Sequence, residues 1–355
     1  MDSRKMPSQQ PAGPAAGAMP RLREWLAAEG GAVPFRRFME AALYDPAFGY
    51  YSRQIRTVGA RGDFSTSATI SPLLAQAMAA WVAEEASGGC RHLIEIGPGS
   101  GTLHRALRQA LGWRGRWHWS SHLVERSAVL RAEQRRTMGA LGWGVQWHEN
   151  PSTALQAAGG QALIFSNELV DAFPVTLLQR QGEQWQEVWL ELQADGRLVE
   201  TLRPAPATGT TLAAVNFAEG QRVEVHDAYR DWFKHWRPEW RGGAMLTIDY
   251  GDTADRLYYR RPGGTVRGYH QHQRLEGLAI YRNPGHCDLT ADVNFSDLMH
   301  WGAADGLENV RWETQTDFLA RYVEARSAPE AWLMDPQGAG GAFRCLIQKI
   351  RPESI

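Results

Sequence analysis

Short apolar runs alternate with amphipathic stretches through the middle of the chain. Five runs predict buried strands, because each is followed by glycine or polar residues where the chain must turn. They are residues 92–96, a run that ends near 125, and residues 145–147, 162–165 and 245–248. Apolar positions at helical spacing separate them. This alternation predicts a doubly wound α/β domain with a mostly parallel sheet over residues 88–350, in which the run at 342–350 is a last, antiparallel edge strand.

Three other regions differ from this alternation. Residues 175–240 alternate apolar and polar positions between Gln-Gly and Ala-Asp-Gly turns, which predicts an inserted antiparallel meander followed by a helix. Residues 250–292 are rich in Gly, Tyr, Arg and His and lack periodicity, which favours a long active-site loop region. Residues 21–87 are predicted as an N-terminal helical cap, and residues 1–20 as a disordered tail.

Composition narrows the class of protein. The 355 residues are 43% hydrophobic and 22% charged, with a net charge of −1, as in an ordinary globular protein. No global excess of positive charge supports binding to nucleic acid, and no long apolar run predicts a membrane span. Three widely separated cysteines predict neither a disulfide scaffold nor a CxxC metal site. His270 and His272 have no nearby acid or cysteine to complete a metal site, so no metal is predicted.

The strongest chemical signal is the turn after the first predicted strand. Gly97, Gly99 and Gly101 lie between a strand and a helix, where glycines let the backbone approach a ligand at the helix N-terminus. A dinucleotide site has its third glycine one position later, and residue 102 is threonine. A Gly-x-Gly-x-Gly turn with an acid two positions before it, here Glu95, is typical of S-adenosylmethionine sites. The alternative is a plain strand–helix turn.

Polar residues after the next two strands support a nucleoside ligand. Glu125 ends the second predicted strand, where a carboxylate can accept hydrogen bonds from both ribose hydroxyls. Dinucleotide and S-adenosylmethionine sites share such an acid, so the presence of Glu125 does not distinguish between these two kinds of site. After the third strand, His148 or Glu149 can meet the adenine amino group, although Glu149 alone is equally consistent with an exposed loop acid.

A second polar set belongs to the same edge of the sheet, because it follows the fourth and fifth strands. Carboxylates in this place can orient a neutral nucleophile, receive its proton and hold a guanidinium bidentately. Helix capping is the alternative role for Glu168 and Asp171. The set predicts a methyl-acceptor site beside the cofactor. It consists of Asn167, Glu168, Asp171, Asp249 and Tyr250.

Six ordered segments together resemble the MidA family of class I methyltransferase-like proteins. The family includes a mitochondrial arginine methyltransferase that assists assembly of respiratory complex I. The segments are residues 35–51, 62–67, 95–103, 167–174, 248–293 in three pieces, and 314–319. The chain departs from the family pattern at Ala68-Thr69, where Pro-Glu is usual, at Ser100, where Arg is frequent, and at Asp292 and Asn294, where His and Asp are expected.

The resemblance implies a Rossmann-like class I methyltransferase fold with an N-terminal helical cap and an inserted antiparallel segment. It implies S-adenosyl-L-methionine as cofactor and an arginine of a protein client as acceptor, in the bacterial cytoplasm or, alternatively, the mitochondrial matrix. A homodimer is a further expectation. By position, Gly97, Gly99, Gly101 and Glu125 hold the cofactor, Asp63, Phe64 and Thr66 line its site from the cap, and Asn167, Glu168, Asp249 and Tyr250 face the acceptor. An assembly factor that docks a client, and a small-molecule methyltransferase, remain alternatives.

Tryptophan is abundant, with fifteen residues. Five of them cluster between the first and third predicted strands, and we predict that they pack in the core or at an interface. The alternative is a face that docks a protein. The cluster consists of Trp113, Trp117, Trp119, Trp143 and Trp147.

Overall fold

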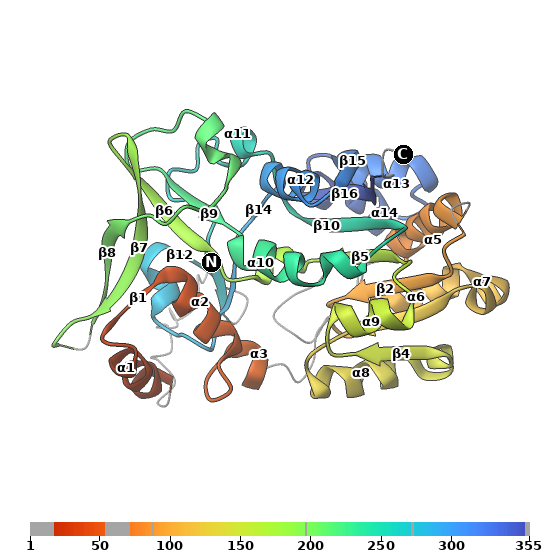
Figure 1. Ribbon diagram of the computed structural model, residues 1–355, viewed down its shortest axis with the longest axis horizontal. Coiled ribbons are helices and arrows are strands. Elements are labelled where there is room, and N and C mark those ends of the chain that lie inside the picture. Colours follow the sequence, from red (N-terminus) through yellow and green to blue (C-terminus); the bar gives the residue numbers. More distant parts are fainter. Residues whose placement is uncertain (1–17, 54–71, 87–88, 196, 271–272, 352–355) are drawn as a thin grey trace, which may run out of the picture.

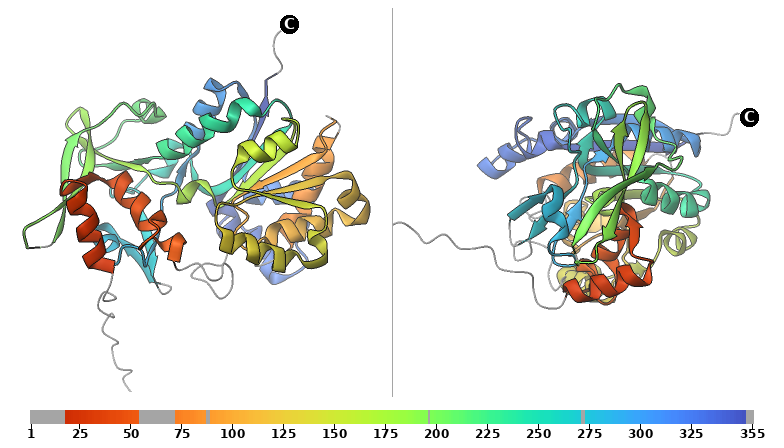
Figure 2. Two further views of the ribbon diagram at one scale, coloured as in Figure 1. Left: turned by 60° about the horizontal axis from the view of Figure 1, so that its bottom comes forward. Right: turned by 90° about the vertical axis from the view of Figure 1, so that its left-hand side faces the viewer.

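A computed structural model describes residues 18–53, 72–86, 89–195, 197–270 and 273–351. Over these residues the molecule has two lobes that lie side by side (Figure 1). The larger lobe is on the right of the figure and the smaller lobe on the left, and Figure 2 shows the same division from two other directions. Within the described ranges, no helix is both long and apolar enough to cross a membrane.

One sheet forms the centre of the larger lobe. Its strands are β2 (His92–Ile96), β3 (Ser120–Val124), β4 (Val145–His148), β5 (Leu163–Asn167), β10 (Ala244–Asp252), β14 (Val293–Asn294), β15 (Leu307–Thr314) and β16 (Phe343–Ile350). They follow the order β15–β16–β10–β5–β2–β3–β4, with β14 beside β10. The pairs from β4 to β10 are parallel, whereas β16 is antiparallel to both of its neighbours. The predicted α/β fold with a mostly parallel sheet is therefore confirmed.

The carboxyl-terminal strand was predicted correctly as antiparallel but wrongly as an edge strand. β16 lies between β10 and β15, and Cys345, Leu346 and Ile347 are buried there. The edge strand is β15, which the apolar pattern did not reveal. Only Leu307 of β15 is fully buried, because an edge strand leaves much of its length exposed.

Helices cover both faces of the sheet, because successive side chains of a strand point to opposite faces. Leu93 of β2 belongs to one apolar core and Ile94 to the other. The first core includes α5 (Leu73–Glu85), α6 (Thr102–Ala110), α13 (Gln315–Tyr322) and α14 (Ala328–Leu333). The second includes α9 (Pro151–Ala157), α10 (Asp227–Trp236) and α12 (Phe295–Ala304). Two further helices, α7 (Gly112–His118) and α8 (Ala128–Met138), flank β3 and β4.

Segments from three distant parts of the chain build the smaller lobe around a common apolar core. The first contributes α1 (Ala18–Ala28), β1 (Ala32–Pro34), α2 (Phe35–Tyr44) and α3 (Tyr50–Arg53). The second is the predicted antiparallel insert, with β6 (Thr176–Gln181), β7 (Gln184–Leu192), β8 (Leu198–Pro204) and β9 (Arg222–Val225). The third contributes β11 (Arg267–His270), β12 (Gln273–Glu276) and β13 (Asp288–Thr290). β1 pairs with β7 and so joins the inserted sheet.

The segment expected as a single helical cap, 21–87, contributes to both lobes. Its first part, up to residue 53, packs in the smaller lobe, whereas α5 packs against the central sheet of the larger one. The difference follows from the side chains of α5, because Leu73, Leu74, Met78, Trp81 and Val82 are all buried there. An apolar face this wide requires a large partner surface, which the sheet provides.

The region expected as a loop, 250–292, contains a small antiparallel sheet of β12, β11 and β13. These strands have three or four residues each, and β12 has no buried residue. Strands this short do not produce a recognisable alternation, which is why the sequence pattern did not reveal them. Leu289 and Ala291 nevertheless enter the core of the smaller lobe.

Candidate active site

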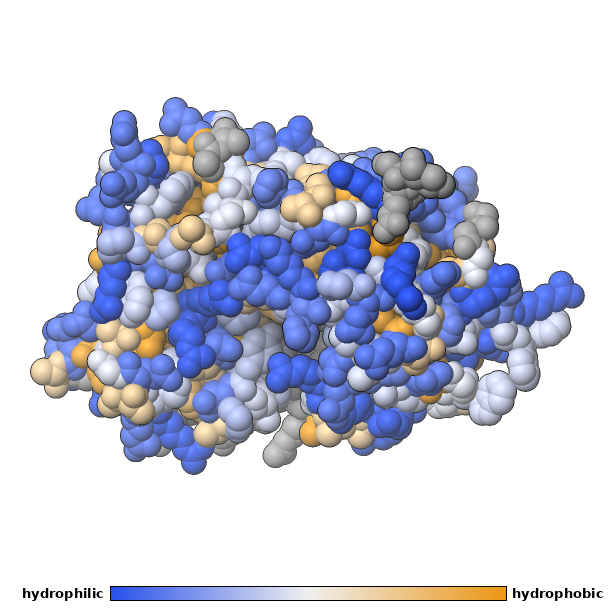
Figure 3. All heavy atoms as spheres, viewed as in Figure 1, coloured by the Kyte–Doolittle hydropathy of each residue, from blue (hydrophilic) through white to orange (hydrophobic). Residues whose placement is uncertain are grey.

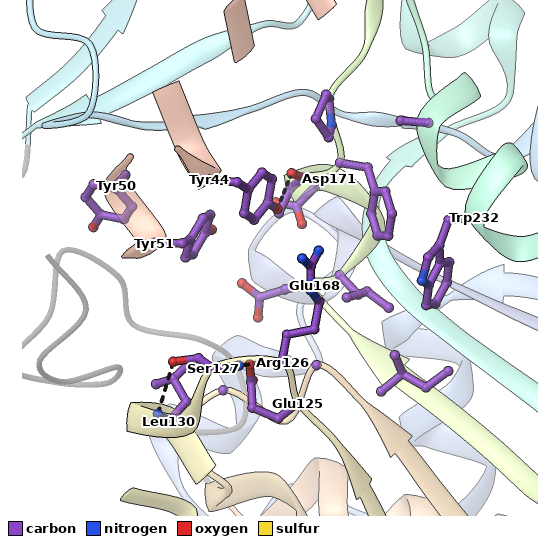
Figure 4. Close-up of a pocket in the computed structure, with 18 of the residues that line it drawn as sticks. Tyr44, Tyr50, Tyr51, Glu125, Arg126, Ser127, Leu130, Glu168, Asp171 and Trp232 are labelled. Atoms are coloured by element: carbon purple, nitrogen blue, oxygen red, sulfur yellow. Dashed lines mark hydrogen bonds between the residues drawn. The ribbon is translucent and has the colours of Figure 1, made fainter. Parts of the chain in front are cut away.

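A cavity of about 1660 Å³ lies between the two lobes. One wall comes from the carboxyl ends of the parallel strands, through residues after β2, β3, β5 and β10. The opposite wall comes from the smaller lobe, through α2, α3, β11 and β13. Figure 4 shows the side chains of both walls pointing into one space. The carboxyl edge of the sheet, which the sequence indicated, thus forms one wall of this cavity.

The glycine turn forms the floor of the cavity on the sheet side. Gly97, Gly99 and Gly101 have φ angles of 67°, 52° and 81°, which favour glycine over other residues. A Cβ on Gly97 would lie 2.7 Å from Leu169 Cδ1, so a larger residue there would have to displace the Leu169 side chain. Gly97 and Gly99 line the cavity, whereas Gly101 precedes α6 and packs against Gln134.

Glu95 is buried in the same wall and has a partner that the sequence did not reveal. His104 Nδ1 lies 3.0 Å from Glu95 Oε2, and both side chains are almost wholly enclosed. The ring of His104 also stacks on Phe165, at 6.0 Å between centroids. This arrangement holds the Glu95 carboxylate in one orientation. The nine-residue spacing of the pair could have suggested it, because β2 and α6 flank the glycine turn.

Glu125 follows β3 and lines the cavity, as its position predicted. Its Oε1 accepts a hydrogen bond of 2.7 Å from the backbone N–H of Ser127. Burial raises the pKa of the Glu125 carboxyl above its ordinary value. The carboxylate is therefore fixed at a strand end, next to Leu130 of α8, where a hydroxyl-bearing ligand can reach it (Figure 4).

The two candidates after the third strand behave differently. Glu149 lines the cavity, where its side chain is 73% exposed and pairs with Arg131. His148 does not line it, so the proposed contact of His148 with adenine is not supported by its position. Its Nε2 instead lies 3.0 Å from Nδ1 of His122, whose Nε2 lies 3.0 Å from Nδ1 of His92. The direction of the side chain on β4 decides this, and the sequence alone did not specify it.

Three predicted cofactor residues cannot be placed. Asp63, Phe64 and Thr66 lie outside the described residues.

Glu168 occupies a strained backbone position at the end of β5. Its φ angle is +53°, in the left-handed region that residues other than glycine rarely adopt. The N–H of Glu168 donates to the carbonyl of Ile248 at 2.9 Å, and Asn167 Nδ2 donates to Glu168 Oε1 at 3.0 Å. Strain of this kind is typical of functional sites, where the surrounding structure holds it in place. Both Asn167 and Glu168 line the cavity.

Asp249 does not face the acceptor, contrary to the expectation. It is fully buried, and its Oδ2 accepts hydrogen bonds from the backbone N–H groups of Leu169, Val170 and Asp171, at 3.1, 2.8 and 3.3 Å. Asp249 is therefore a positioning residue, which holds the turn that carries Glu168. The expectation failed because β10 continues past Asp249 to Asp252, and a buried acid within a strand can satisfy backbone donors as well as a ligand. Tyr250, the next residue, does line the cavity.

Asp171 points into the cavity from this turn and does not cap a helix. Thr290 Oγ1 donates to its Oδ2 at 2.8 Å, and among the described residues its buried Oδ1 has no hydrogen-bond partner. Burial is the main cause that raises the pKa of Asp171. An enclosed carboxylate with an unused oxygen is a site for a donor from outside the chain.

Two tyrosines of the smaller lobe, Tyr44 and Tyr51, also line the cavity and were not among the predicted residues. Tyr44 Oη donates to the carbonyl of Ala172 at 2.8 Å, and Tyr51 Oη donates to Asp288 Oδ1 at 3.0 Å. Their rings stack at 5.4 Å with an interplanar angle of 16°. Figure 4 shows both facing Glu168 and Asp171. Both tyrosines lie in segment 35–51, and the resemblance of that segment to the family was the available sequence signal.

The cavity fits a nucleoside with a charged tail. Gly97 and Gly99 leave its floor without side chains, Glu125 offers a carboxylate at one end, and Glu95 offers a second one beyond the glycine turn. The distribution suits S-adenosyl-L-methionine, which carries ribose hydroxyls and an amino group.

Comparisons with known proteins agree with this geometry. The model of a family described as "Putative S-adenosyl-L-methionine-dependent methyltransferase" matches residues 73–312. Protein arginine methyltransferase NDUFAF7, mitochondrial, from Danio rerio is 28% identical over 92% of this chain and 81% of its own length. Its homologue from Caenorhabditis elegans is 26% identical over 76% of this chain and 68% of its own length.

A solved structure is similar over almost its whole length. It is a COG1565 superfamily member from Burkholderia thailandensis bound to S-adenosyl-homocysteine, with a TM-score of 0.82, 29% identity and 95% coverage of both chains. The family match covers more than half of this chain and includes the glycine turn, Glu125 and the Asn167–Glu168 turn. This chain therefore belongs to the MidA family of S-adenosyl-L-methionine-dependent methyltransferases.

Proposed function

We propose that this methyltransferase modifies an arginine guanidinium of a protein client. The observation that carries the proposal is the pair of acids on the acceptor side, Glu168 and Asp171, faced by Tyr44 and Tyr51. Carboxylates bind a guanidinium through paired, charge-assisted hydrogen bonds. Aromatic rings next to them add a cation–π attraction of about 0.5–2 kcal/mol.

A guanidinium of the chain itself already extends into this space. Arg126 directly follows Glu125, and Figure 4 shows its side chain reaching toward Glu168. The space between Glu168 and Asp171 is thus wide enough for a guanidinium, and the negative charge of the two carboxylates attracts it. A client arginine would take a corresponding place from the open side of the cavity.

The chemistry that the residues provide suits this acceptor. When bound, S-adenosyl-L-methionine supplies a methyl group on a sulfonium centre. A guanidinium nitrogen that gains a methyl group must lose a proton, and a carboxylate with a raised pKa is a better proton acceptor than an ordinary one. Asp171 has such a raised pKa. We assign Asp171 to proton acceptance and Glu168, held by Asn167, to orientation of the guanidinium.

The volume of the cavity leaves room for an acceptor arginine beside the cofactor. Sites for small ligands usually enclose about 300–1000 Å³, whereas this cavity has about 1660 Å³ and is continuous across both lobes. The relatives from Danio rerio and Caenorhabditis elegans are named as protein arginine methyltransferases, which supports the same acceptor.

The test is transfer of tritium from methyl-labelled S-adenosyl-L-methionine to proteins extracted from cells that lack this enzyme. Acid hydrolysis should release labelled methylarginine. Glu168→Gln should abolish the transfer while cofactor binding, measured by calorimetry, persists. Glu183→Gln, in the exposed β6–β7 turn, is the matched control and should keep full activity. Label in small molecules alone would contradict the proposal, as would cofactor binding without any transfer, which would indicate a docking factor.

A further inference from the structure

Three tryptophans of the larger lobe lie on the surface and not in the core. The exposed fractions of Trp113, Trp117 and Trp143 are 63%, 73% and 71%. Of the five tryptophans predicted to pack together, only Trp119 is buried, and Trp147 is partly buried. Trp113, Trp117 and Trp143 therefore do not pack in the core, and an interface or a docking face remains for them. Fully exposed tryptophans that lie together are rare on a protein surface and mark an interaction site.

The three rings form one patch. Trp113 and Trp117 are one helical turn apart on α7, so they share a face. The ring of Trp117 lies 5.2 Å from that of Trp143, which precedes β4. Buried Arg108 holds the Trp143 loop in place, because it donates to the carbonyl of Trp143 at 3.0 Å and to Ser121 Oγ at 2.9 Å. Buried Arg108 thus fixes the position of the loop that carries Trp143.

The stretch of chain that carries Trp113 and Trp117 has positive charge and no acids. Residues 96–124 contain four arginines and no Asp or Glu, although the whole chain has a net charge of −1. Arg114 lies over the ring of Trp113, 5.2 Å from its centroid. Arg116 is close enough to Arg108 to lower its pKa, second in effect to burial. Among the described residues, none of the four forms a salt bridge, whereas arginines elsewhere in the chain commonly do; the four are Arg105, Arg108, Arg114 and Arg116.

The patch lies at the end of the sheet opposite to the active site. α7 leads into the amino end of β3, and Trp143 precedes the amino end of β4, whereas the glycine turn follows the carboxyl end of β2. Figure 1 places α7 at the right-hand extremity of the molecule. The same extremity in Figure 3 shows pale and strongly hydrophilic side chains together. A partner bound there would leave the cavity between the lobes open.

We propose that this patch docks the protein on the surface of an anionic membrane. Tryptophan rings favour the headgroup region of a bilayer, where one side of the ring meets acyl chains and the N–H meets water. Arginines next to them meet lipid phosphates, and positive charge near an anionic leaflet strengthens binding. The patch combines exposed rings with arginines that form no described salt bridge, and residues 96–124 contain no carboxylate. These features match an anionic membrane surface better than a protein partner, whose interface would bury the rings and pair the arginines with acids.

The test uses the full chain and vesicles of phosphatidylcholine, with or without phosphatidylglycerol. The protein should sediment with the anionic vesicles, bind the neutral ones weakly, and dissociate as salt is raised. Phosphatidylcholine brominated on its acyl chains should quench part of the tryptophan emission, because bromine quenches only on contact.

Two sets of variants separate the contributions. Trp113→Ser with Trp117→Ser and Trp143→Ser should remove the bromine quenching and weaken vesicle binding roughly ten-fold or more. Arg114→Gln and Arg116→Gln should each weaken binding to anionic vesicles roughly five-fold. Trp332→Ser is the matched control, since Trp332 is 50% exposed on a different helix, and it should change neither reading. Calorimetric binding of S-adenosyl-L-methionine verifies that each variant is folded.

Several outcomes would overturn the proposal. Equal sedimentation with neutral and anionic vesicles would show that the arginines do not contribute to binding. Unchanged bromine quenching in the triple tryptophan variant would show that the three rings do not contact the membrane. A dimer in solution that the triple tryptophan variant converts to monomer would assign the patch to a second copy of the chain. Tighter binding to single-stranded RNA than to anionic vesicles, lost in the same variant, would assign it to nucleic acid.

Discussion

Asp249 holds the backbone N–H of Val170 at 2.8 Å, and through the neighbouring N–H groups it holds the whole turn after Glu168. The turn that carries Glu168 and Asp171 thus depends on a carboxylate that does not line the cavity. Strand β10 supplies this support, and strand β5 supplies the functional side chains.

Replacement of Asp249 should separate positioning from binding. Asp249→Ala leaves three N–H groups without their acceptor, and each buried unsatisfied group costs about 1–3 kcal/mol. We expect the free energy of unfolding to fall by roughly 2–5 kcal/mol in denaturant titrations. In protein that remains folded, methyl transfer should fall far more than cofactor affinity. Asp249→Asn keeps one acceptor oxygen and should recover part of both losses; equal losses in the two variants would contradict this role.

A side chain at position 97 should weaken cofactor binding. Gly97→Ala places a Cβ 2.7 Å from Leu169 Cδ1 and keeps a φ of +67°, so we expect cofactor affinity to fall at least about ten-fold. The control is Gly182→Ala, which has a φ of +58° and no atom within 4 Å of the new Cβ. This control variant therefore has the strain of a positive φ angle but no steric contact. Similar cofactor affinities for the two variants in calorimetry would disprove the steric argument.

Glu125 should contribute directly to cofactor affinity. Glu125→Ala removes the carboxylate after β3, and the loss of its hydrogen bonds should weaken S-adenosyl-L-methionine binding by about 1–3 kcal/mol. Because burial raises the pKa of Glu125, binding that needs its ionised form should weaken as pH falls, beginning at a higher pH than for an exposed glutamate. Calorimetry over a pH series measures both effects. Glu149→Gln, at an exposed site, should alter the affinity for S-adenosyl-L-methionine little. A larger loss of affinity in this variant than in Glu125→Ala would identify Glu149, and not Glu125, as the acid that binds the cofactor.

The histidine row across β2, β3 and β4 should make stability depend on pH. Burial, with the neighbouring histidines, lowers the pKa of His122 to about 3, against about 6.5 in the unfolded chain. Between these values the unfolded chain binds more protons, so stability is complete above about pH 6.5 and is lost as pH falls. From about pH 8 to about pH 5 we expect His122 to account for roughly 2 kcal/mol of lost stability.

Denaturant titrations of His122→Gln at both pH values measure this contribution. The variant should lose less stability on acidification than the parent chain. His118→Gln, at an exposed position, is the control and should follow the parent. An unchanged pH dependence in His122→Gln would show that the row does not carry the effect.

The sheet and the glycine turn could be predicted because both are local in sequence. Residues 92–101 contain a buried strand, its terminal acid and three glycines with positive φ, and each of these leaves a pattern within a few positions. Glu125, Asn167 and Glu168 followed from one rule, since parallel strands bring their carboxyl ends to one edge.

The remaining features depend on contacts between distant residues. Nothing local distinguishes Asp249, which binds backbone, from Glu168, which lines the cavity, because each is an acid that directly follows an apolar run. Tyr44 reaches the site only because α2 packs in the smaller lobe, 128 positions away from its partner Ala172. The exposure of Trp117 could not be inferred either, because a helix of seven residues has no clear apolar face.

The way β1 joins the inserted sheet has a consequence for the order of folding. Val33 of β1 pairs with Leu190 of β7. Strands β2, β3, β4 and β5 lie between them in the sequence, so the ribosome makes these four strands before β1 can pair. Contacts so distant in sequence form slowly. In a newly made chain, the sheet edge with the glycine turn should therefore form first, and the wall of the cavity that the smaller lobe contributes should form last. Until then the apolar side of α2 stays uncovered. A chaperone that shields α2 would act at this stage of synthesis.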